Sequence, residues 1–342
     1  MYYDLCKLLS LKDINGNTPE LYLVVSNRSD GKTTAFAKWL VKRFLNYGEK
    51  FCLFYRFKNE LSNVVENFFT PTVQKFFHGI TPHEEKRKKG LYVELFINNK
   101  PCGYAVALNS ADKLKKCSAA FNDVERIFMD EFLAEMYCPN ELAKFFSVHT
   151  SIARGDGKQY RYVPVYMCGN PSTILNPYFV SLGIHERITK NTHFLRGDGF
   201  ILDYHVNLHA SAAQQKSAFN RAFSNDTNIR LNTTAEFIND VDTFIETASR
   251  LIRSLCVIKH KGKFYNVCVM SNNLLYVRDI NDINCRYRFA GSKEDFNAEY
   301  ILPINSNIVT ALKRNFQNGQ VRFKNLLCKS AFINLIGMQS IM

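Results

Sequence analysis

The sequence lacks the long apolar runs, the secretion signal and the paired cysteines that would place it in a membrane or an oxidising compartment. No apolar stretch reaches the roughly 18 to 20 residues that cross a bilayer. The N-terminus MYYDLCKLLSLKD has neither the basic start nor the apolar core of a signal peptide. None of the ten cysteines forms a C-x-x-C pair, and the eight histidines show no H-E-x-x-H spacing. We therefore expect a cytoplasmic protein without membrane contact, disulfides or a zinc site.

Composition and charge describe a folded, basic protein. Apolar residues make up 46% and aromatic residues 13% of the 342 positions, and a chain of this length favours two domains. The net charge of +13 indicates a polyanionic partner. Residues 238–342 hold 14 Lys and Arg against 8 Asp and Glu, a net +6 that leaves +7 for the first 237 residues. The basic excess is denser in the C-terminal third, although a merely solubilising surface is the alternative.

Residues 21–34, LYLVVSNRSDGKTT, have the pattern of a phosphate-binding loop. A strand-like apolar run breaks into a polar loop that ends in Gly-Lys-Thr, and an amphipathic helix follows. Such a loop turns its backbone N–H groups around phosphates at a helix N-terminus. Lys32 would reach the β- and γ-phosphates and the Thr33 hydroxyl would hold Mg²⁺. The candidate nucleotide-binding residues of the loop are Ser26, Asn27, Arg28, Ser29, Asp30, Gly31, Lys32, Thr33 and Thr34.

The loop departs from the pattern G-x-x-x-x-G-K-[ST] at its first position, where Ser26 stands in place of glycine. Serine tolerates the turn less freely than glycine does. The alternative is an ordinary loop before a surface helix, because a G-K-T tripeptide alone is weak evidence. The strand before the loop and the helix after it favour nucleotide binding.

A second segment, RIFMDEF at residues 126–132, ends in Asp130 and Glu131. It is typical of a buried parallel strand with two acids at its carboxyl end. In phosphoryl-transfer ATPases an Asp in this place binds Mg²⁺, usually through water, and the next Glu polarises the attacking water. An isolated Asp-Glu pair would favour a solvated strand end. Its order and spacing after the phosphate loop favour an ATPase.

The remaining pattern predicts the order of elements. Strand-like and helix-like segments alternate over roughly the first 200 residues, which favours a mostly parallel sheet. Consecutive strands from residue 250 onward predict a β-meander. The individual expectations are a strand at 51–57, a charged turn at 84–90 (EEKRKKG), a hairpin of LYVELFI and CGYAVAL, a helix at 141–153, a strand at 162–170, a helical linker at 205–237, and helices at 305–317 and 321–338.

The order of these elements resembles the DNA-packaging ATPases of phi-29-like podophages. The resemblance rests on SNRSDGKT, NYGEKFCLFYRFKNEL, RIFMDEF and CGNPSTILNPYF, and extends to the C-terminal meander. It implies an α/β fold: a P-loop ATPase domain of the additional-strand, catalytic-glutamate type at residues 1–204, with a mostly parallel sheet. A helical linker or small helical subdomain at 205–237 and a smaller α+β, ribonuclease-H-like domain at 238–342 would follow.

The same resemblance implies a terminase-like motor that uses ATP and Mg²⁺ to translocate viral double-stranded DNA into the procapsid. Its partners would be the DNA, the portal or connector of the procapsid, prohead RNA, and copies of itself in a ring, which the family suggests has five subunits. It would work in the host cytoplasm, transiently docked on the procapsid.

The resemblance also assigns roles to single residues. Glu131 would be the catalytic carboxylate, and Asp130 would hold Mg²⁺ through water. Asn170 matches a strand-end position that senses the γ-phosphate; a capping or turn Asn beside Pro171 is the alternative. Arg154, after the helix at 141–153, matches a finger that completes a neighbour's catalytic site in trans. The alternative for Arg154 is an exposed arginine in the flexible loop RGDGK.

Basic residues outside the nucleotide site are candidates for contact with nucleic acid. A motor that grips DNA of any sequence needs Lys and Arg contacts to phosphate. We expect such contacts from Lys86, Arg87, Lys88 and Lys89. For Lys115 and Lys116 we expect either contact with DNA or a role in the site of a neighbouring subunit. Arg56 and Lys58 are expected near the nucleotide or the DNA pore. For all of these, a solvated surface is the alternative.

The C-terminal domain lacks the acids that a two-metal nuclease needs. The strands IRSLCVIKH and KFYNVCVM contain no Asp or Glu, and Asp279 and Asp282 come only at the end of the third strand. We therefore predict no nuclease activity. Two other functions stay open: another nucleic-acid translocase or helicase-type ATPase, and a nucleic-acid-binding scaffold with a decayed nucleotide site.

Overall fold

The computed structural model describes residues 3–133, 138–154, 160–171, 176–188, 192–222, 244–292, 294–304 and 306–338. Its contacts divide the chain into two compact units, residues 1–239 and residues 240–342. The loop 155–158 after Arg154, residues 172–175 of CGNPSTILNPYF and residues 223–237 of the expected linker lie outside the described residues. No helix in the described part of the chain is long and apolar enough to span a membrane.

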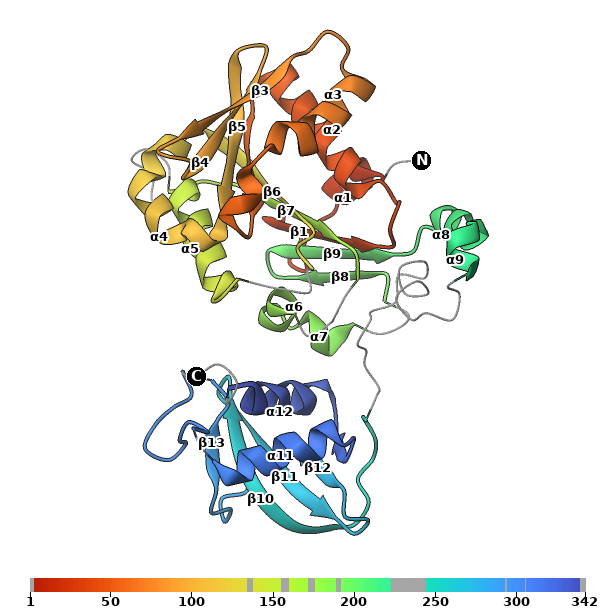
Figure 1. Ribbon diagram of the computed structural model, residues 1–342, viewed down its shortest axis with the longest axis vertical. Helices are drawn as coiled ribbons and strands as arrows, with labels where there is room; N and C mark the ends of the chain where they lie inside the picture. Colours follow the sequence, from red (N-terminus) through yellow and green to blue (C-terminus); the bar gives the residue numbers. More distant parts are fainter. Residues whose placement is uncertain are drawn as a thin grey trace. The chain divides into compact units, whose positions relative to one another are not determined.

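A nine-stranded, mostly parallel sheet organises the described residues of the first unit (Figure 1), as predicted. The order of the strands in this sheet is β3 (Pro82–Arg87), β4 (Tyr92–Ile97), β5 (Lys100–Ala107), β2 (Lys50–Tyr55), β6 (Val124–Asp130), β7 (Val165–Gly169), β1 (Leu21–Ser26), β9 (Phe200–His205) and β8 (Phe194–Gly197). Strand β7 lies between β1 and β6 and pairs with both in parallel. One additional strand therefore separates the strand before the phosphate loop from the strand that ends in Asp130.

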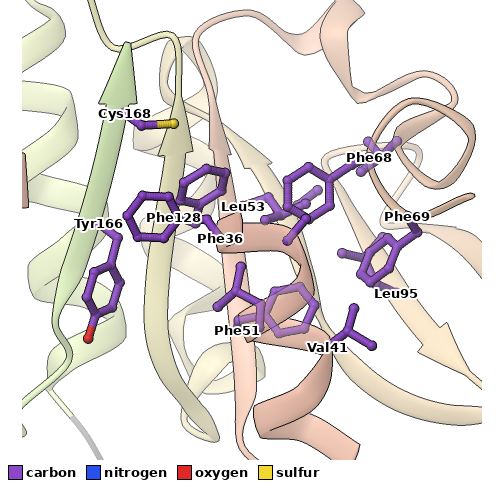
Figure 2. Packing of buried hydrophobic residues seen from close by; sticks show 14 of the residues in the cluster. Phe36, Val41, Phe51, Leu53, Phe68, Phe69, Leu95, Phe128, Tyr166 and Cys168 are labelled. Atoms are coloured by element: carbon purple, nitrogen blue, oxygen red, sulfur yellow. The ribbon is translucent and has the colours of Figure 1, made fainter. Parts of the chain in front are cut away.

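Helices cover both faces of this sheet because its central strands are apolar on both sides. On one face Phe36 of α2 (Lys32–Tyr47) stacks on Phe128 of β6 with ring centroids 5.0 Å apart (Figure 2). On the other face Phe54 of β2 meets Phe145 of α5 (Glu141–Ala153) at 5.8 Å, and Phe145 meets Tyr178 of α6 (Pro177–Ser181). The remaining helical segments of this unit are α1 (Leu5–Leu9), η1 (Lys58–Leu61), η2 (Val65–Phe69), α3 (Thr70–Phe76), η3 (Leu108–Ser110), α4 (Ala111–Leu114), η4 (Lys115–Phe121) and α7 (Ile184–Arg187).

Most of the predicted elements of the first unit are present, with one correction. The helix at 141–153 is confirmed, and the strands expected at 51–57 and 162–170 are confirmed in shorter form. The hairpin of β4 and β5 turns on Asn98 and Asn99, both with positive φ. The charged turn expected at 84–90 is wrong, because residues 82–87 form strand β3 and pair with β4 along six residues. Only the end of that segment turns.

The expected linker also differs from the observed division into units. Its helices α8 (Leu208–Lys216) and α9 (Ala218–Ala222) belong to the first unit. The Gln214 amide of α8 donates to the Arg28 carbonyl and to the Ser29 hydroxyl, each over 3.0 Å. The apolar face of α8 is weak, as the sequence indicates, and polar contacts connect this helix to the phosphate loop.

The described residues of the second unit form a five-stranded mixed sheet and two helices, α11 (Asn307–Gln317) and α12 (Leu326–Met338), whose apolar side chains join the core. The predicted meander of β10, β11 and β12 is confirmed. Residues 321–323, expected as helix, form β14 instead, because Val321 and Phe323 are buried and β14 pairs in parallel with β12. The sheet order is β13 (Arg288–Ala290), β10 (Leu251–His260), β11 (Lys263–Met270), β12 (Leu275–Arg278) and β14 (Val321–Phe323).

Candidate nucleotide-binding and catalytic site

The loop between β1 and α2 has the backbone of an anion-binding turn. Ser29 and Gly31 adopt left-handed conformations, with φ of 67° and 78°, and Gly31 is the N-cap of α2. The left-handed φ costs glycine little and other residues more, which explains the glycine directly before Lys32. The first N–H groups of α2 therefore face the loop, where a phosphate would accept their hydrogen bonds.

Lys32 is held inside this loop. Its side chain is 6% exposed, and its ammonium donates to the Ser26 carbonyl at 3.1 Å, the Ser26 hydroxyl at 3.0 Å, the Asn27 carbonyl at 3.2 Å and Asn170 Oδ1 at 3.2 Å. Burial lowers the pKa of Lys32, while the surrounding acidic groups oppose that shift. The loop thus places a desolvated cation where the pattern expects contact with phosphate.

The acidic strand end and Asn170 meet at the same edge of the sheet as the loop. Strands β6, β7 and β1 are parallel neighbours, so their carboxyl ends lie side by side. Asn170 Nδ2 donates to Glu131 Oε1 over 2.9 Å, while Asn170 Oδ1 accepts from Lys32. Cys168 Sγ donates to Asp130 Oδ1 over 2.9 Å. The structure therefore brings together the phosphate loop, both acids and Asn170.

Glu131 combines an unusual backbone with a perturbed carboxyl group. Its φ of 49° is left-handed, and its backbone N–H donates to Asp130 Oδ1 at 3.0 Å. Partial desolvation and the negative charge of Asp130 raise the pKa of Glu131, although the residue remains accessible to solvent and Lys32 opposes the shift. Backbone strain and a raised carboxyl pKa are features that concentrate at functional sites.

Arg56 donates hydrogen bonds to the backbone at Glu131, a role that the sequence did not reveal. Its guanidinium donates to the Glu131 carbonyl at 2.9 Å and to the Phe132 carbonyl at 2.6 Å, and its Nε donates to Glu141 at 3.1 Å. Glu141 also accepts from the Tyr178 hydroxyl at 2.6 Å. The Arg56 side chain is only 8% exposed, so the part of the expectation that placed it on DNA does not fit. Its partners lie 75 to 85 residues away, beyond the reach of any local pattern.

Arg154 and Lys115 lie at a different surface. Arg154 is exposed after the last turn of α5. It lines a cavity of about 460 Å³ with Lys115, and the other lining residues are Ser118, Ala143, Phe146, Ser147, Thr150 and Ser151. No residue of the phosphate loop or of the acidic strand end belongs to this lining. Lys115 also pairs with Asp112 at 3.6 Å, and Lys116 is exposed.

The basic run at residues 86–89 is divided between strand and turn. Arg87 pairs with Glu85 at 2.6 Å and with Glu94 at 2.7 Å. The Lys88 ammonium donates to Cys117 Sγ at 3.1 Å. Lys86 and Lys89 are exposed, and Lys58 donates to the Lys89 carbonyl at 3.4 Å. Two of the four cations are therefore engaged within the fold.

The oxygens near the loop fit a hard cation. Thr33 lies in the first turn of α2, directly after the loop, and Asp130 ends β6, whose carboxyl end lies at the same edge of the sheet. Mg²⁺ prefers such oxygen ligands and is usually held by one or two protein groups together with nucleotide phosphates. Within the described ranges, no group of three or more His, Cys, Asp or Glu side chains is arranged to hold a metal. The donor set suits magnesium brought with a nucleotide.

The chain is similar to viral DNA packaging proteins. The family model of the podovirus DNA encapsidation protein (Gp16) matches residues 1–341. The DNA packaging protein of Bacillus phage B103 is 28% identical over 320 residues, which are 91% of this chain and 94% of that protein. The DNA packaging protein of Bacillus phage phi29 is 26% identical over 338 residues, which are 96% of this chain and 95% of that protein. A chain of the solved bacteriophage phi-29 viral genome packaging motor assembly shares the fold, with a TM-score of 0.65, 22% identity and 99% of both chains covered.

Proposed function

The chain belongs to the podovirus DNA encapsidation protein (Gp16) family, and we propose that it hydrolyses ATP to translocate viral double-stranded DNA into a procapsid. The observation that carries this proposal is the chain of contacts from Lys32 through Asn170 to Glu131, at the edge where a P-loop and an acidic strand end meet. We assign the ATPase chemistry to the first unit and the binding of packaging partners to the basic second unit.

Each residue of the site has a proposed task. Backbone N–H groups of the loop and the Lys32 ammonium bind the β- and γ-phosphates. Thr33 and Asp130 would hold Mg²⁺, Asp130 through water; the bound ion would neutralise phosphate charge. Glu131 orients the attacking water and accepts its proton. Because Asn170 contacts both Lys32 and Glu131, it is placed to report the state of the phosphates to the catalytic carboxylate.

We propose that Arg154 completes the site of a neighbouring copy rather than its own. Its exposure and its place in a separate cavity support this assignment, since a finger acting in cis would be expected among the loop contacts. Lys115 lines the same cavity and could deliver a second cation to the neighbour. An arginine finger stabilises charge that develops on the transferring phosphoryl group, so a lone subunit would hydrolyse ATP slowly. A ring is then required, and the family resemblance suggests five subunits.

Mixing two inactive variants tests this arrangement. Glu131→Gln subunits retain Arg154 but lack the catalytic carboxylate, and Arg154→Ala subunits retain Glu131 but lack the finger. Steady-state ATP hydrolysis is measured for each variant alone and for the mixture, with duplex DNA at low salt. If Arg154 acts in trans, the mixture recovers part of the wild-type activity, because some intact Glu131 sites gain an intact Arg154 from a neighbour.

The controls separate the possible failures. Lys113→Ala removes an exposed cation of α4 that does not line the cavity, and it should retain wild-type turnover. A mixture no more active than its components would contradict a finger in trans. A wild-type protein that binds no ATP would overturn the ATPase itself and favour a nucleic-acid-binding scaffold.

The partners follow from charge and from the family. Exposed Lys86, Lys89, Lys115 and Lys116 are candidates for sequence-independent contact with DNA phosphates. The net +6 of residues 238–342 suits DNA, the portal or prohead RNA as a partner of the second unit. The motor would act in the host cytoplasm while docked on the portal of the procapsid.

We further propose that the second unit does not cut DNA. Strands β10 and β11 carry no acidic residue. Asp279, which follows β12, accepts from the Lys324 ammonium at 2.5 Å and from Asn325 at 3.3 Å. A carboxylate engaged by a lysine is a poor candidate for a two-metal site, which needs several acids aimed at one point.

A further inference from the structure

We propose that His205 is a positioning residue of the phosphate loop: as an imidazolium it fixes and neutralises Asp30, which together with Ser26 closes the loop at the position that lacks glycine. This inference rests on the proposed nucleotide binding. It concerns residues that the loop pattern does not specify, and it explains how a loop that begins with serine and contains an aspartate can still receive phosphates.

Asp30 ties the end of the loop to its beginning. The residue is 3% exposed, and its Oδ2 accepts from the Ser26 hydroxyl at 2.6 Å. The Asn207 amide donates to Oδ1 at 2.8 Å. Asn207 and Asn27 also exchange two hydrogen bonds, at 2.8 and 3.1 Å. The turn is thus held by side-chain hydrogen bonds that span it, so the flexibility of a leading glycine is not needed.

A buried carboxylate in this loop poses an electrostatic problem. Asp30 belongs to the loop that would surround the phosphates. The negative charge of its carboxylate therefore repels the negatively charged ligand. Lys32 lies nearby, but its ammonium donates to Ser26, Asn27 and Asn170, and its charge is the one assigned to the phosphates. A second cation beside Asp30 would offset the charge of that carboxylate and leave the charge of Lys32 for the ligand.

His205 supplies that cation by geometry. Strand β9 pairs with β1 so that His205 stands opposite Ser26. His205 Nε2 lies 3.0 Å from Asp30 Oδ2, and His205 Nδ1 lies 3.2 Å from Asp203 Oδ1. An ionised carboxylate only accepts hydrogen bonds, so two carboxylates on the two ring nitrogens require a proton on each nitrogen. The ring is therefore an imidazolium.

The surroundings of His205 hold its proton in place. Tyr3 stacks on the ring with centroids 5.4 Å apart and donates its hydroxyl to Asp203 Oδ2 at 2.6 Å. Burial lowers the pKa of His205, but the hydrogen bonds and charges of Asp203 and Asp30 outweigh it and raise the pKa to about 9. Burial raises the pKa of Asp30, but hydrogen bonds from His205, Ser26 and Asn207 lower it to about 2. The titratable groups that face the ring are Asp30, Asp203 and Tyr3, with Lys32 behind Asp30.

The test compares the affinity of wild-type protein and His205→Gln for Mg²⁺·ATPγS by calorimetry from pH 6 to pH 10. The substituted glutamine keeps a polar side chain but cannot carry charge. We expect the variant to bind about tenfold more weakly at neutral pH, which is the effect of losing one hydrogen-bonded charge. As pH rises through about 9 the wild-type ring loses its proton, so the ratio of the two dissociation constants should fall toward one.

A double-mutant cycle with Asp30→Asn distinguishes charge neutralisation from a merely structural role. Without the carboxylate there is nothing to neutralise, so His205→Gln should change affinity by less than about threefold in the Asp30→Asn background. Trp39, the single tryptophan, reports by its fluorescence whether each variant folds. A ratio that is constant with pH, or an equal loss in both backgrounds, would overturn this inference alone. A wild-type protein that binds no ATPγS at any pH would overturn the proposed function and this inference with it.

Discussion

Asn170 joins Lys32 and Glu131: its amide nitrogen donates to the carboxylate over 2.9 Å, and its amide oxygen accepts from the ammonium at 3.2 Å. One neutral side chain thus contacts the group assigned to phosphate binding and the group assigned to water activation. A change at the phosphates that moves Lys32 would also move Asn170 and so alter its contact with Glu131. This link is the physical basis of the coupling that we assign to Asn170.

Replacement of Asn170 should slow hydrolysis more than it weakens binding. Asn170→Asp keeps an acceptor for Lys32 but cannot donate to Glu131, so kcat should fall roughly 10- to 100-fold, as for other residues that orient a catalytic group. The new carboxylate also adds negative charge at the site, so ATP affinity should fall too, but by a smaller factor than kcat. Asn170→Ala should lose both contacts. Single-turnover hydrolysis and equilibrium ATP binding measure the two effects. Full turnover in Asn170→Asp would show that the bond to Glu131 is dispensable.

Glu131→Gln should retain ATP and fail to hydrolyse it. The amide keeps the size of the side chain but cannot accept a proton from water, and loss of a general base lowers kcat by about 10² to 10⁴-fold. Glu125→Gln on the same strand is the matched control, because that carboxylate pairs with Arg161 at 3.7 Å on the surface. Rapid-quench measurement of phosphate release decides the matter. A turnover rate within twofold of wild type would remove Glu131 from the mechanism.

Glu141→Gln should destabilise the first unit. The change removes the Glu141 carboxylate from its buried ion pair with Arg56, and breaking a buried ion pair costs about 3–5 kcal/mol of the free energy of unfolding. Glu125→Gln, which breaks an exposed pair, should cost less than about 1 kcal/mol. Urea unfolding followed by Trp39 fluorescence reports this unit. Equal costs for the two variants would mean that the Arg56–Glu141 pair does not hold the strand end.

The stability of the first unit should depend on pH through His205. Its pKa is about 9 in the folded protein and 6.5 ordinarily. The folded state therefore binds the proton more tightly. This contribution is fully present below about pH 6.5 and is lost as pH rises through about 9. Thermal unfolding of wild type and His205→Gln from pH 6 to 10 should give curves that converge at high pH. His78→Gln, at an exposed histidine, is the control and should run parallel to wild type.

The protein should leave DNA intact. Supercoiled plasmid incubated with Mg²⁺ or Mn²⁺ should remain supercoiled, because β10 and β11 offer no acidic ligand and Asp279 is paired with Lys324. Lys324→Ala removes the lysine that pairs with Asp279, and we expect this variant to leave the plasmid supercoiled as well, because β10 and β11 still offer no acidic ligand. Nicking by wild type that chelation abolishes would contradict the prediction.

The sequence by itself determined the features that local pattern encodes. The phosphate loop, the strand that ends in Asp130 and Glu131, the helix at 141–153 and the C-terminal meander follow from hydrophobic period, turn residues and motif spacing, which depend on neighbouring residues. The predictions of a turn at residues 84–87 and of a helix at residues 321–323 were wrong. Charged residues on an edge strand resemble a turn, and a three-residue strand is recognised only through its partner.

Only the tertiary structure decided which distant residues serve the site. Arg56 reaches Glu131 across 75 positions and His205 reaches Asp30 across 175, because parallel strands bring their carboxyl ends to one edge whatever their separation in the chain. Arg56 lies in the stretch NYGEKFCLFYRFKNEL, but that stretch does not show which backbone groups the guanidinium contacts, and His205 belongs to none of the quoted motifs. The sequence could place the chemical groups on their strands; the order and register of those strands determined which groups meet.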